Sequence, residues 1–174
     1  MLLTVLFYPY LYFANNYQHQ NHCDMYGELN EMQIEHLLLS QSIGHLGCTD
    51  GKKPYVLPVT YLYATGYIYS QTWAGKKLDI MRINPLVCLE VYRHTDMFNY
   101  QSVIVWGQFE ELSDEEAIEA RTILYENVFQ LMTPAAVHLH EHGTTSVVDD
   151  EDRYKAVIYR IKIEEKTGRF KTSQ

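Results

Sequence analysis

The chain has 174 residues and a formal net charge of -8, with 47% apolar and 21% charged residues, a composition typical of one globular domain. The acidic surplus argues against a nucleic-acid-binding surface, which needs clustered Lys and Arg. The three cysteines form no CxxC pair, so neither a disulfide framework nor a zinc ribbon is indicated, and we expect a reducing, cytoplasmic compartment.

The first 24 residues differ in character from the rest. The apolar start MLLTVLFYPYLYFANN lacks a basic n-region and a small-residue cleavage site, and its apolar run is too short to span a bilayer. A polar stretch without periodicity follows. We interpret residues 1–24 as a leader that is poorly ordered or lies upstream of a native start at Met25, and residues 25–174 as the folded domain. No membrane partner is expected.

A helix and a hairpin open the domain. Asn30 and Gln33 have the spacing of a capping box and precede an apolar stripe, which predicts a helix over 31–41. Strands are predicted over 43–49 and 54–63, joined by a turn at Asp50-Gly51. In the second strand Pro58 cannot donate to a ladder, which favours an edge, a bulge or a place where a ligand replaces the neighbouring strand.

Shorter elements alternate through the remainder of the chain. A strand over 67–71 leads to a short helix over 76–83 that ends at Asn84-Pro85. Ser113 and Glu116 form a second apparent capping box, which predicts a helix to about residue 131. The predicted strands that remain are 86–92, 101–111 and 154–163, the last followed by the basic tail EKTGRFKTSQ. Six strands with short helices between them predict a mainly β fold, an antiparallel barrel that is closed or partly closed.

The junction YSQTWAGKKLDIMRINP carries the clearest chemical signal. Gly75, Lys76 and Lys77 open the predicted helix, where unpaired N–H groups, the positive end of the helix dipole and two ammonium groups can meet a phosphate monoester. The alternative is that both lysines are solvated surface residues. The chain has neither GxxxxGK[ST] nor GxGxxG, so no nucleoside triphosphate or Rossmann-bound dinucleotide is indicated.

Three blocks of sequence occur in a characteristic order. They are IGHLGCTDGKKPYVLPVTYLY, IYSQTWAGKKLDIMRINPLVCLEV and SVIVWGQFEEL. In this order the blocks resemble the FMN-binding split-barrel flavoproteins related to pyridoxamine 5'-phosphate oxidase, and most of all the branch that includes the nitroimidazole-resistance proteins. The similarity runs from about Met25 to Gly168. It implies a six-stranded antiparallel split β-barrel that binds FMN at a homodimer interface.

The resemblance also implies roles for individual residues. Lys77, with Lys76, would contact the FMN phosphate, and Gln71 and Thr72 would contact the ribityl chain or the ring. The residues that would line the flavin ring, partly through backbone groups, are Val56, Leu57, Pro58, Val59 and Thr60. Ser102 and Trp106 would approach from the neighbouring subunit. Plain strand packing is the alternative for the residues from 56 to 60, and a core position is the alternative for Trp106.

The chain differs in two places from the family that it resembles. Pyridoxamine phosphate oxidases proper end with an Arg/His-bearing segment that binds the substrate phosphate, whereas the last strand here offers Arg160 alone. Gln71 stands where nitroimidazole-resistance members often have a histidine. We therefore predict an FMN-dependent oxidoreductase that passes electrons from NAD(P)H to a small acceptor, a nitro compound or a quinone, without vitamin B6 oxidation. No side chain is assigned as a catalytic acid or base.

Histidines offer a rival interpretation. His138, His140 and His142 alternate in HLHEH, and in an extended segment they would point the same way and could ligate a metal or haem. A polar loop with solvated histidines explains the same pattern, and we predict no metal site. His45 is interpreted as a structural histidine. The alternative function is a flavin or haem carrier without catalytic turnover.

Overall fold

The computed structural model describes residues 24–128 and 156–173, which form eight strands and three helices. In chain order they are β1 (Asp24–Glu28), α1 (Glu31–Ser40), β2 (Ile43–Thr49), β3 (Pro54–Thr60), β4 (Leu62–Ala64), β5 (Tyr67–Thr72), α2 (Lys76–Ile83), β6 (Leu86–His94), β7 (Tyr100–Glu111), α3 (Asp114–Asn127) and β8 (Val157–Ser173). The mainly β prediction is confirmed.

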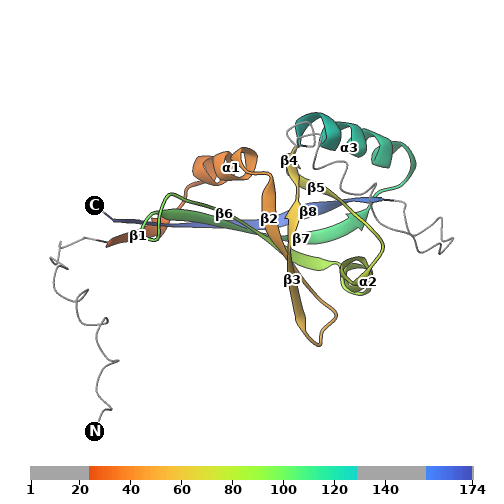
Figure 1. Ribbon diagram of the computed structural model, residues 1–174, viewed down its shortest axis with the longest axis horizontal. Helices are drawn as coiled ribbons and strands as arrows, with labels where there is room; N and C mark the ends of the chain where they lie inside the picture. Colours follow the sequence, from red (N-terminus) through yellow and green to blue (C-terminus); the bar gives the residue numbers. More distant parts are fainter. Residues whose placement is uncertain (1–23, 129–155, 174) are drawn as a thin grey trace, which may run out of the picture.

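One antiparallel sheet contains all of these strands. Its order is β3-β2-β6-β7-β8-β5-β4, and β1 pairs with β8 outside this path. β3 and β4 are the two ends of the order, yet only Tyr61 separates them in sequence. The sheet must therefore curl back on itself, as a partly closed barrel does, while β6, β7, β8 and β1 extend away from the curled part (Figure 1).

The chain changes its pairing partner at Tyr61. Its N–H donates to the Ser42 carbonyl at 2.9 Å, and its hydroxyl donates to the Leu38 carbonyl at 2.9 Å. The ring is fully buried. The predicted strand over 54–63 is thus two strands, because residues before Tyr61 pair with β2 and residues after it pair with β5.

The predicted basic tail is instead the second half of a long strand. β8 continues to Ser173 and pairs with β1 from Arg169 onward. The prediction of a strand that ends at residue 163 was wrong because the charges along this segment have partners: Lys166 bonds to Glu31 and Glu35, and Arg169 bonds to Glu28. Because these charges on an internal strand are paired, they do not carry the cost of unpaired buried charges that the sequence pattern suggested.

The ends of α1 and α2 agree with the signals predicted from the sequence, whereas the start of α3 does not. At α1 the Asn30 side chain accepts from the Gln33 N–H at 3.0 Å, and the Gln33 side chain accepts from the Asn30 N–H at 2.9 Å, which confirms the capping box. α2 has the predicted bounds. At α3, Ser113 makes no capping bond, and Asp114 takes a left-handed φ of 49° that turns the chain away from capping geometry.

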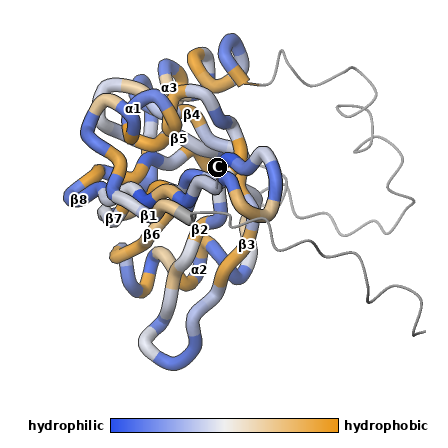
Figure 2. The backbone as a smooth tube through the Cα atoms, turned by 90° about the vertical axis from the view of Figure 1, so that its left-hand side faces the viewer, coloured by the Kyte–Doolittle hydropathy of each residue, from blue (hydrophilic) through white to orange (hydrophobic). Residues whose placement is uncertain are grey.

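The core lies between the curled sheet and the helices. α1 buries Leu37 and Leu38 against it, and α2 buries Leu78 and Met81. Full burial of one such side chain contributes about 1.5–3 kcal/mol. A smaller cluster under α3 contains Leu112, Ala120, Leu124 and Ile158. The β2–β3 turn at the lower end of the molecule is hydrophilic (Figure 2).

No helix of the described residues is both long and apolar enough to cross a membrane. The same residues also contain no cluster of three or more His, Cys, Asp or Glu side chains able to hold a metal ion. The predicted leader over residues 1–24 lies outside the described residues except for Asp24, which is the first residue of β1. The histidines 138, 140 and 142 lie outside them as well.

Candidate functional site

The two lysines of the predicted phosphate site bridge two strands that are far apart in sequence. The ammonium of Lys76 lies 4.9 Å from the ring centroid of Tyr55 on β3, and that of Lys77 lies 5.9 Å from the ring centroid of Tyr159 on β8. Both distances are within the range of cation–π attraction. We call Tyr55, Lys76, Lys77 and Tyr159 the lysine corner.

The charge of Lys77 is not neutralised by the described part of the chain. Burial lowers the pKa of its ammonium, and the Cys48 thiol is the one titratable group there that opposes this shift. No carboxylate of the described residues forms an ion pair with Lys77. A cation withdrawn from water without a counter-ion is unfavourable, so the corner favours an added anion.

The helix start reinforces this preference. α2 begins after Gly75, which has no side chain to cap the first N–H groups, and the first helical bond of this turn runs from the Asp79 N–H to the Gly75 carbonyl at 3.1 Å. The earlier N–H groups of a helix have no partner within it, and the dipole is positive there. The start of α2 therefore offers unpaired N–H donors in the same turn of helix that carries Lys76 and Lys77.

A buried hydroxyl lies in the same region. Tyr159 is fully buried, and within the described residues its hydroxyl has only the Ser70 hydroxyl beside it, without the geometry of a regular hydrogen bond. Burial raises its pKa to about 12, which keeps it protonated as a donor. Ser70, its partner across β5 and β8, donates instead to the Thr60 carbonyl at 2.7 Å. An unsatisfied buried donor costs about 1–3 kcal/mol, so it too fits a site that a polar ligand completes.

Gln71 and Thr72 point to opposite faces of β5, because successive side chains of a strand alternate. Thr72 shares the buried face of Ser70, and its hydroxyl donates to the Trp73 carbonyl at 3.2 Å. Gln71 lies on the other face, where α3 packs, and its Oε1 is buried without a partner in the described residues. The structure thus places Thr72, but not the Gln71 side chain, on the face of the lysine corner.

β3 offers a backbone edge beside the corner. In the described residues it pairs with β2 alone, so its other side has free N–H and C=O groups, and the edge position predicted for Pro58 is confirmed. Val56 and Pro58 are exposed, Leu57 and Thr60 are half-buried and Val59 is buried. The exposed pair and the free edge could contact a flat ligand, whereas Val59 belongs to the core.

Ser102 and Trp106 lie on β7, away from the lysine corner. Tyr159 pairs with Glu111 near one end of β7, whereas Ser102 pairs with Arg169 near the other end. This separation is roughly 30 Å along the strand. Trp106 is 39% exposed, so its alternative interpretation as a core residue is wrong. One chain cannot bring Ser102 to its own lysine corner.

The outer face of β3, β2, β6 and β7 carries exposed apolar side chains. Val56, Gly47, Cys88 and Trp106 occupy one cross-strand row, in which a Cβ at Gly47 would stand 2.8 Å from the Cys88 Sγ. Large apolar residues of this face with more than a third of their surface exposed include Ile43, Val56, Leu86, Tyr92 and Trp106. Exposed large apolar side chains on one sheet face, here interspersed with His45 and Glu90, can mark a protein interface.

Two functional candidates were missed from the sequence. Tyr55 directly precedes the residues predicted to line a flavin, so its signal was available. Tyr159 lies 82 positions after Lys77 in a chain of 174 residues, and only the pairing of β5 with β8 brings it near. The sequence predicted a strand that contains Tyr159, but not the identity of its neighbours.

Comparisons with known proteins agree with this geometry. An uncharacterised protein of Rhizobium meliloti is 27% identical over 84 residues, which are 48% of this chain and 56% of that protein; the match thus spans about half of the relative. A solved FAD-binding protein of Mesorhizobium loti is 27% identical with a TM-score of 0.67, covering 86% of this chain and 98% of its own.

A second solved structure shares the fold. It is a proposed 5-nitroimidazole antibiotic resistance protein of Bacteroides thetaiotaomicron, 18% identical with a TM-score of 0.62, covering 86% of this chain and 90% of its own. The family profile described as pyridoxamine 5'-phosphate oxidase matches residues 30–170, which include β2 to β7, most of β8 and the lysine corner. The split-barrel prediction is confirmed, and the chain belongs to the pyridoxamine 5'-phosphate oxidase family.

Proposed function

We propose that this protein binds FMN in the lysine corner and acts as an FMN-dependent oxidoreductase. The observation that carries the proposal is Lys77, a half-buried ammonium without a carboxylate partner in the described residues, at the uncapped start of α2. A phosphate monoester supplies the missing negative charge and accepts from the helix N–H groups. The relationship to a protein described as FAD-binding supports a flavin as the molecule that carries this phosphate.

The number of positive groups in the lysine corner favours FMN over a dinucleotide. Two ammonium groups and one helix start match a single terminal phosphate, and each charge-assisted hydrogen bond contributes about 1.5–3 kcal/mol. Lys76 also contacts Tyr55 on β3, so the ring of a ligand held here by its phosphate would extend along β3. The free edge of β3 and the exposed Val56 and Pro58 are placed to contact that ring.

A second copy of the chain completes this site in the proposal. Ser102 and Trp106 lie roughly 15–30 Å along β7 from the position of Tyr159, and both belong to the outer sheet face described above. Pairing of two such faces in a homodimer would bury Trp106 and bring both residues toward the partner's flavin. This arrangement accounts for an exposed Trp beside other exposed apolar residues.

The protein contributes binding and orientation in this mechanism. When bound, FMN supplies the two-electron redox chemistry. Lys77 and the start of α2 hold the phosphate, β3 orients the ring through its backbone, and the apolar dimer face excludes water from the reacting side. By resemblance, the donor is NAD(P)H and the acceptor is a nitro compound or a quinone.

Ligand identification tests the proposal directly. The purified protein should carry a yellow ligand with the absorbance and mass of FMN, and ligand-free protein should bind FMN more tightly than riboflavin, which lacks the phosphate. Equal affinity for the two would refute the phosphate site. Oxidation of NADH or NADPH with nitro and quinone acceptors then tests the enzyme: turnover no faster than that of free FMN would leave a carrier without catalytic function.

A further inference from the structure

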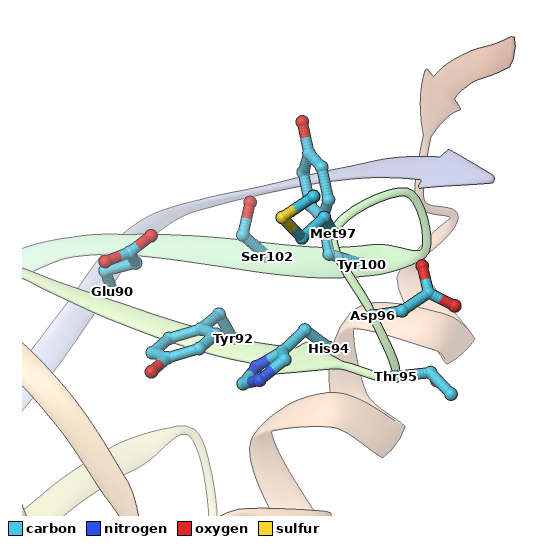
Figure 3. A pocket seen from close by; sticks show the side chains of 8 residues that line it. All are labelled: Glu90, Tyr92, His94, Thr95, Asp96, Met97, Tyr100 and Ser102. Atoms are coloured by element: carbon cyan, nitrogen blue, oxygen red, sulfur yellow. The ribbon is translucent and has the colours of Figure 1, made fainter. Parts of the chain in front are cut away.

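A hollow separate from the lysine corner opens on the outer sheet face, at the β6–β7 hairpin. It has a volume of about 550 Å³, enough for a small aromatic molecule. β6 contributes Tyr92 and His94, and β7 contributes Tyr100 and Ser102. Figure 3 shows the Tyr92 and His94 rings side by side, with Ser102, Tyr100 and Met97 projecting from the β7 side.

The aromatic wall of this hollow is ordered. His45, Tyr92 and His94 form a stacked series, with centroid distances of 5.8 and 5.6 Å and interplanar angles of 22° and 17°. Tyr92 and Tyr100 are 43% and 39% exposed, so they present ring surface to the hollow rather than to the core. Flat π surfaces attract a second ring and, through their quadrupole, a positive charge.

The charged groups around the hollow have one sign. Glu90 and Asp96 line it, and none of its lining residues is Lys or Arg. Asp96 accepts hydrogen bonds from Asn99 and Phe98, which lower its pKa and keep it ionised. The basic side chains of the neighbouring strand β8 contact other groups: Lys171, which pairs with Tyr100, lies over the rings of Tyr26 and Phe98, and Arg169, which pairs with Ser102, forms an ion pair with Glu28. His45 Nδ1 lies 3.8 Å from Glu90.

We propose that this hollow binds a flat aromatic molecule that carries a positive charge, and that such a cation is a further electron acceptor of the enzyme, beside the nitro compounds and quinones that the resemblance implies. The ring stacks on Tyr92 and His94, and the charge lies between Glu90 and the tyrosine faces. An anionic substrate, such as a phosphate ester, is repelled by the same carboxylates. The hollow thus favours a positively charged ligand, whereas the lysine corner favours a negatively charged one.

The role as acceptor rests on the proposed function. In the proposed homodimer the second copy covers this face, so the hollow becomes a cleft between the two subunits. Ser102 lines the hollow and also faces the flavin site of the second copy, so a bound acceptor would lie beside that site. The cation takes up two electrons and one proton that originate from the nicotinamide donor, and it leaves as a neutral molecule. Loss of the charge removes the attraction to Glu90 and favours product release.

Three probes of similar shape test the charge preference: 1-methylquinolinium as the cation, 1-naphthamide as the neutral ring and 1-naphthoate as the anion. Binding is measured by titration calorimetry at pH 8, where histidine side chains are mainly neutral, with flavin-loaded and flavin-free full-length protein. We expect the cation to bind most tightly and the anion least tightly in both. An anion that binds as well as the cation overturns the proposal.

Variants locate the site. Glu90→Gln should weaken cation binding by roughly two- to fivefold, the scale of an exposed ion pair, and leave the neutral probe unchanged. Glu119→Gln, on the exposed surface of α3, is the matched control. Tyr92→Phe keeps the ring and should retain binding, whereas Tyr92→Leu should weaken both the cation and the neutral probe. Unchanged cation affinity in Glu90→Gln and Tyr92→Leu also overturns the assignment.

The two proposals fail in distinguishable ways. FMN affinity is measured for every variant, and none of these substitutions alters the lysine corner. Normal FMN binding without a cation preference overturns the acceptor site alone. A cation preference in a protein that binds no FMN overturns the proposed function while the binding site stands. Loss of cation binding when FMN is added shows that the flavin itself fills the hollow, and this also overturns the acceptor site.

Discussion

Two lysines of this protein occupy comparable positions and have opposite surroundings. Lys166 on β8 and Lys77 on α2 are both half-buried. The Lys166 ammonium lies 2.6 Å from a Glu31 carboxylate oxygen and also bonds to Glu35. Lys77 faces the Tyr159 ring and has no carboxylate partner in the described residues.

The pKa values of the two ammonium groups shift in opposite directions. Burial alone would lower the pKa of Lys166, but hydrogen bonds to Glu31 and Glu35 outweigh it and raise the pKa. Burial lowers the pKa of Lys77, and no carboxylate opposes it. Burial alone therefore does not determine the role of a charged side chain, because these two lysines are similarly buried and differ in their partners. A compensated cation ties elements together, and an uncompensated one attracts a ligand.

Replacement of Lys77 should have the largest effect. Lys77→Met should weaken FMN binding by about 1.5–3 kcal/mol, roughly 10- to 150-fold, because one charge-assisted contact to the phosphate is lost. Riboflavin affinity should be unchanged. Fluorescence titration measures both, with Lys52→Met at the exposed β2–β3 turn as the control. An equal loss for FMN and riboflavin would place the phosphate elsewhere.

Replacement of Lys166 should affect stability rather than binding. Lys166→Met leaves Glu35 without its cation, while Tyr63 still donates to it at 2.8 Å. We expect the free energy of unfolding to fall by about 1–2 kcal/mol, below the full value of a charged hydrogen bond because the cluster is partly solvated. Urea denaturation of flavin-free protein measures the change. If Lys77→Met destabilised this form more than Lys166→Met, the distinction between the two lysines would collapse.

Acid should weaken the Lys166 cluster at a predictable pH. Burial raises the pKa of Glu35, but hydrogen bonds from Lys166 and Tyr63 outweigh this effect, and the net pKa is below the ordinary value of 4.5. A lowered folded pKa gives stability that is present above the unfolded pKa and is lost as pH falls through the folded one. Stability should therefore decline below about pH 4.5 in the wild type. Glu35→Gln should lack this component, and parallel pH curves for both proteins would contradict it.

Replacement of Lys76 should have the smallest effect of the four predicted changes. Lys76 is exposed and lies over Tyr55 at 4.9 Å, so water screens its charge more than that of Lys77. Lys76→Ala should weaken FMN binding by about 0.5–1 kcal/mol, and high salt should reduce the difference from the wild type further. Titrations at low and high salt measure this. An effect as large as that of Lys77→Met would mean that both lysines share the phosphate equally.

Local signals in the sequence were sufficient for many elements of the fold. The Asn30 and Gln33 pair located α1, and the stop at Asn84-Pro85 located the end of α2. The signals failed where pairing over long distances decides the structure. Lys166 and Arg169 gave the C-terminal segment the composition of a tail, and only their partners on α1 and β1 make it a strand.

The candidate site likewise combines features that local sequence signals indicate with features that depend on long-range strand pairing. Lys76 and Lys77 were predictable because glycine, two lysines and a helix start are adjacent in sequence. The contact of Lys77 with Tyr159 depends on how β8 is aligned with β5, which no local pattern encodes. The orientation of Gln71 depends on the phase of β5, and a shift of one residue would have reversed it.

β8 spans 17 residues and pairs with β5 where it begins, with β7 over most of its length and with β1 where it ends. Tyr159 of the lysine corner and the residues that face the β6–β7 hairpin are therefore carried by one uninterrupted backbone. Its amide hydrogens should be among the slowest to exchange with solvent. Any opening that frees one end must either break this strand or transmit the displacement along it, so the lysine corner and the β6–β7 hairpin are mechanically linked within one chain.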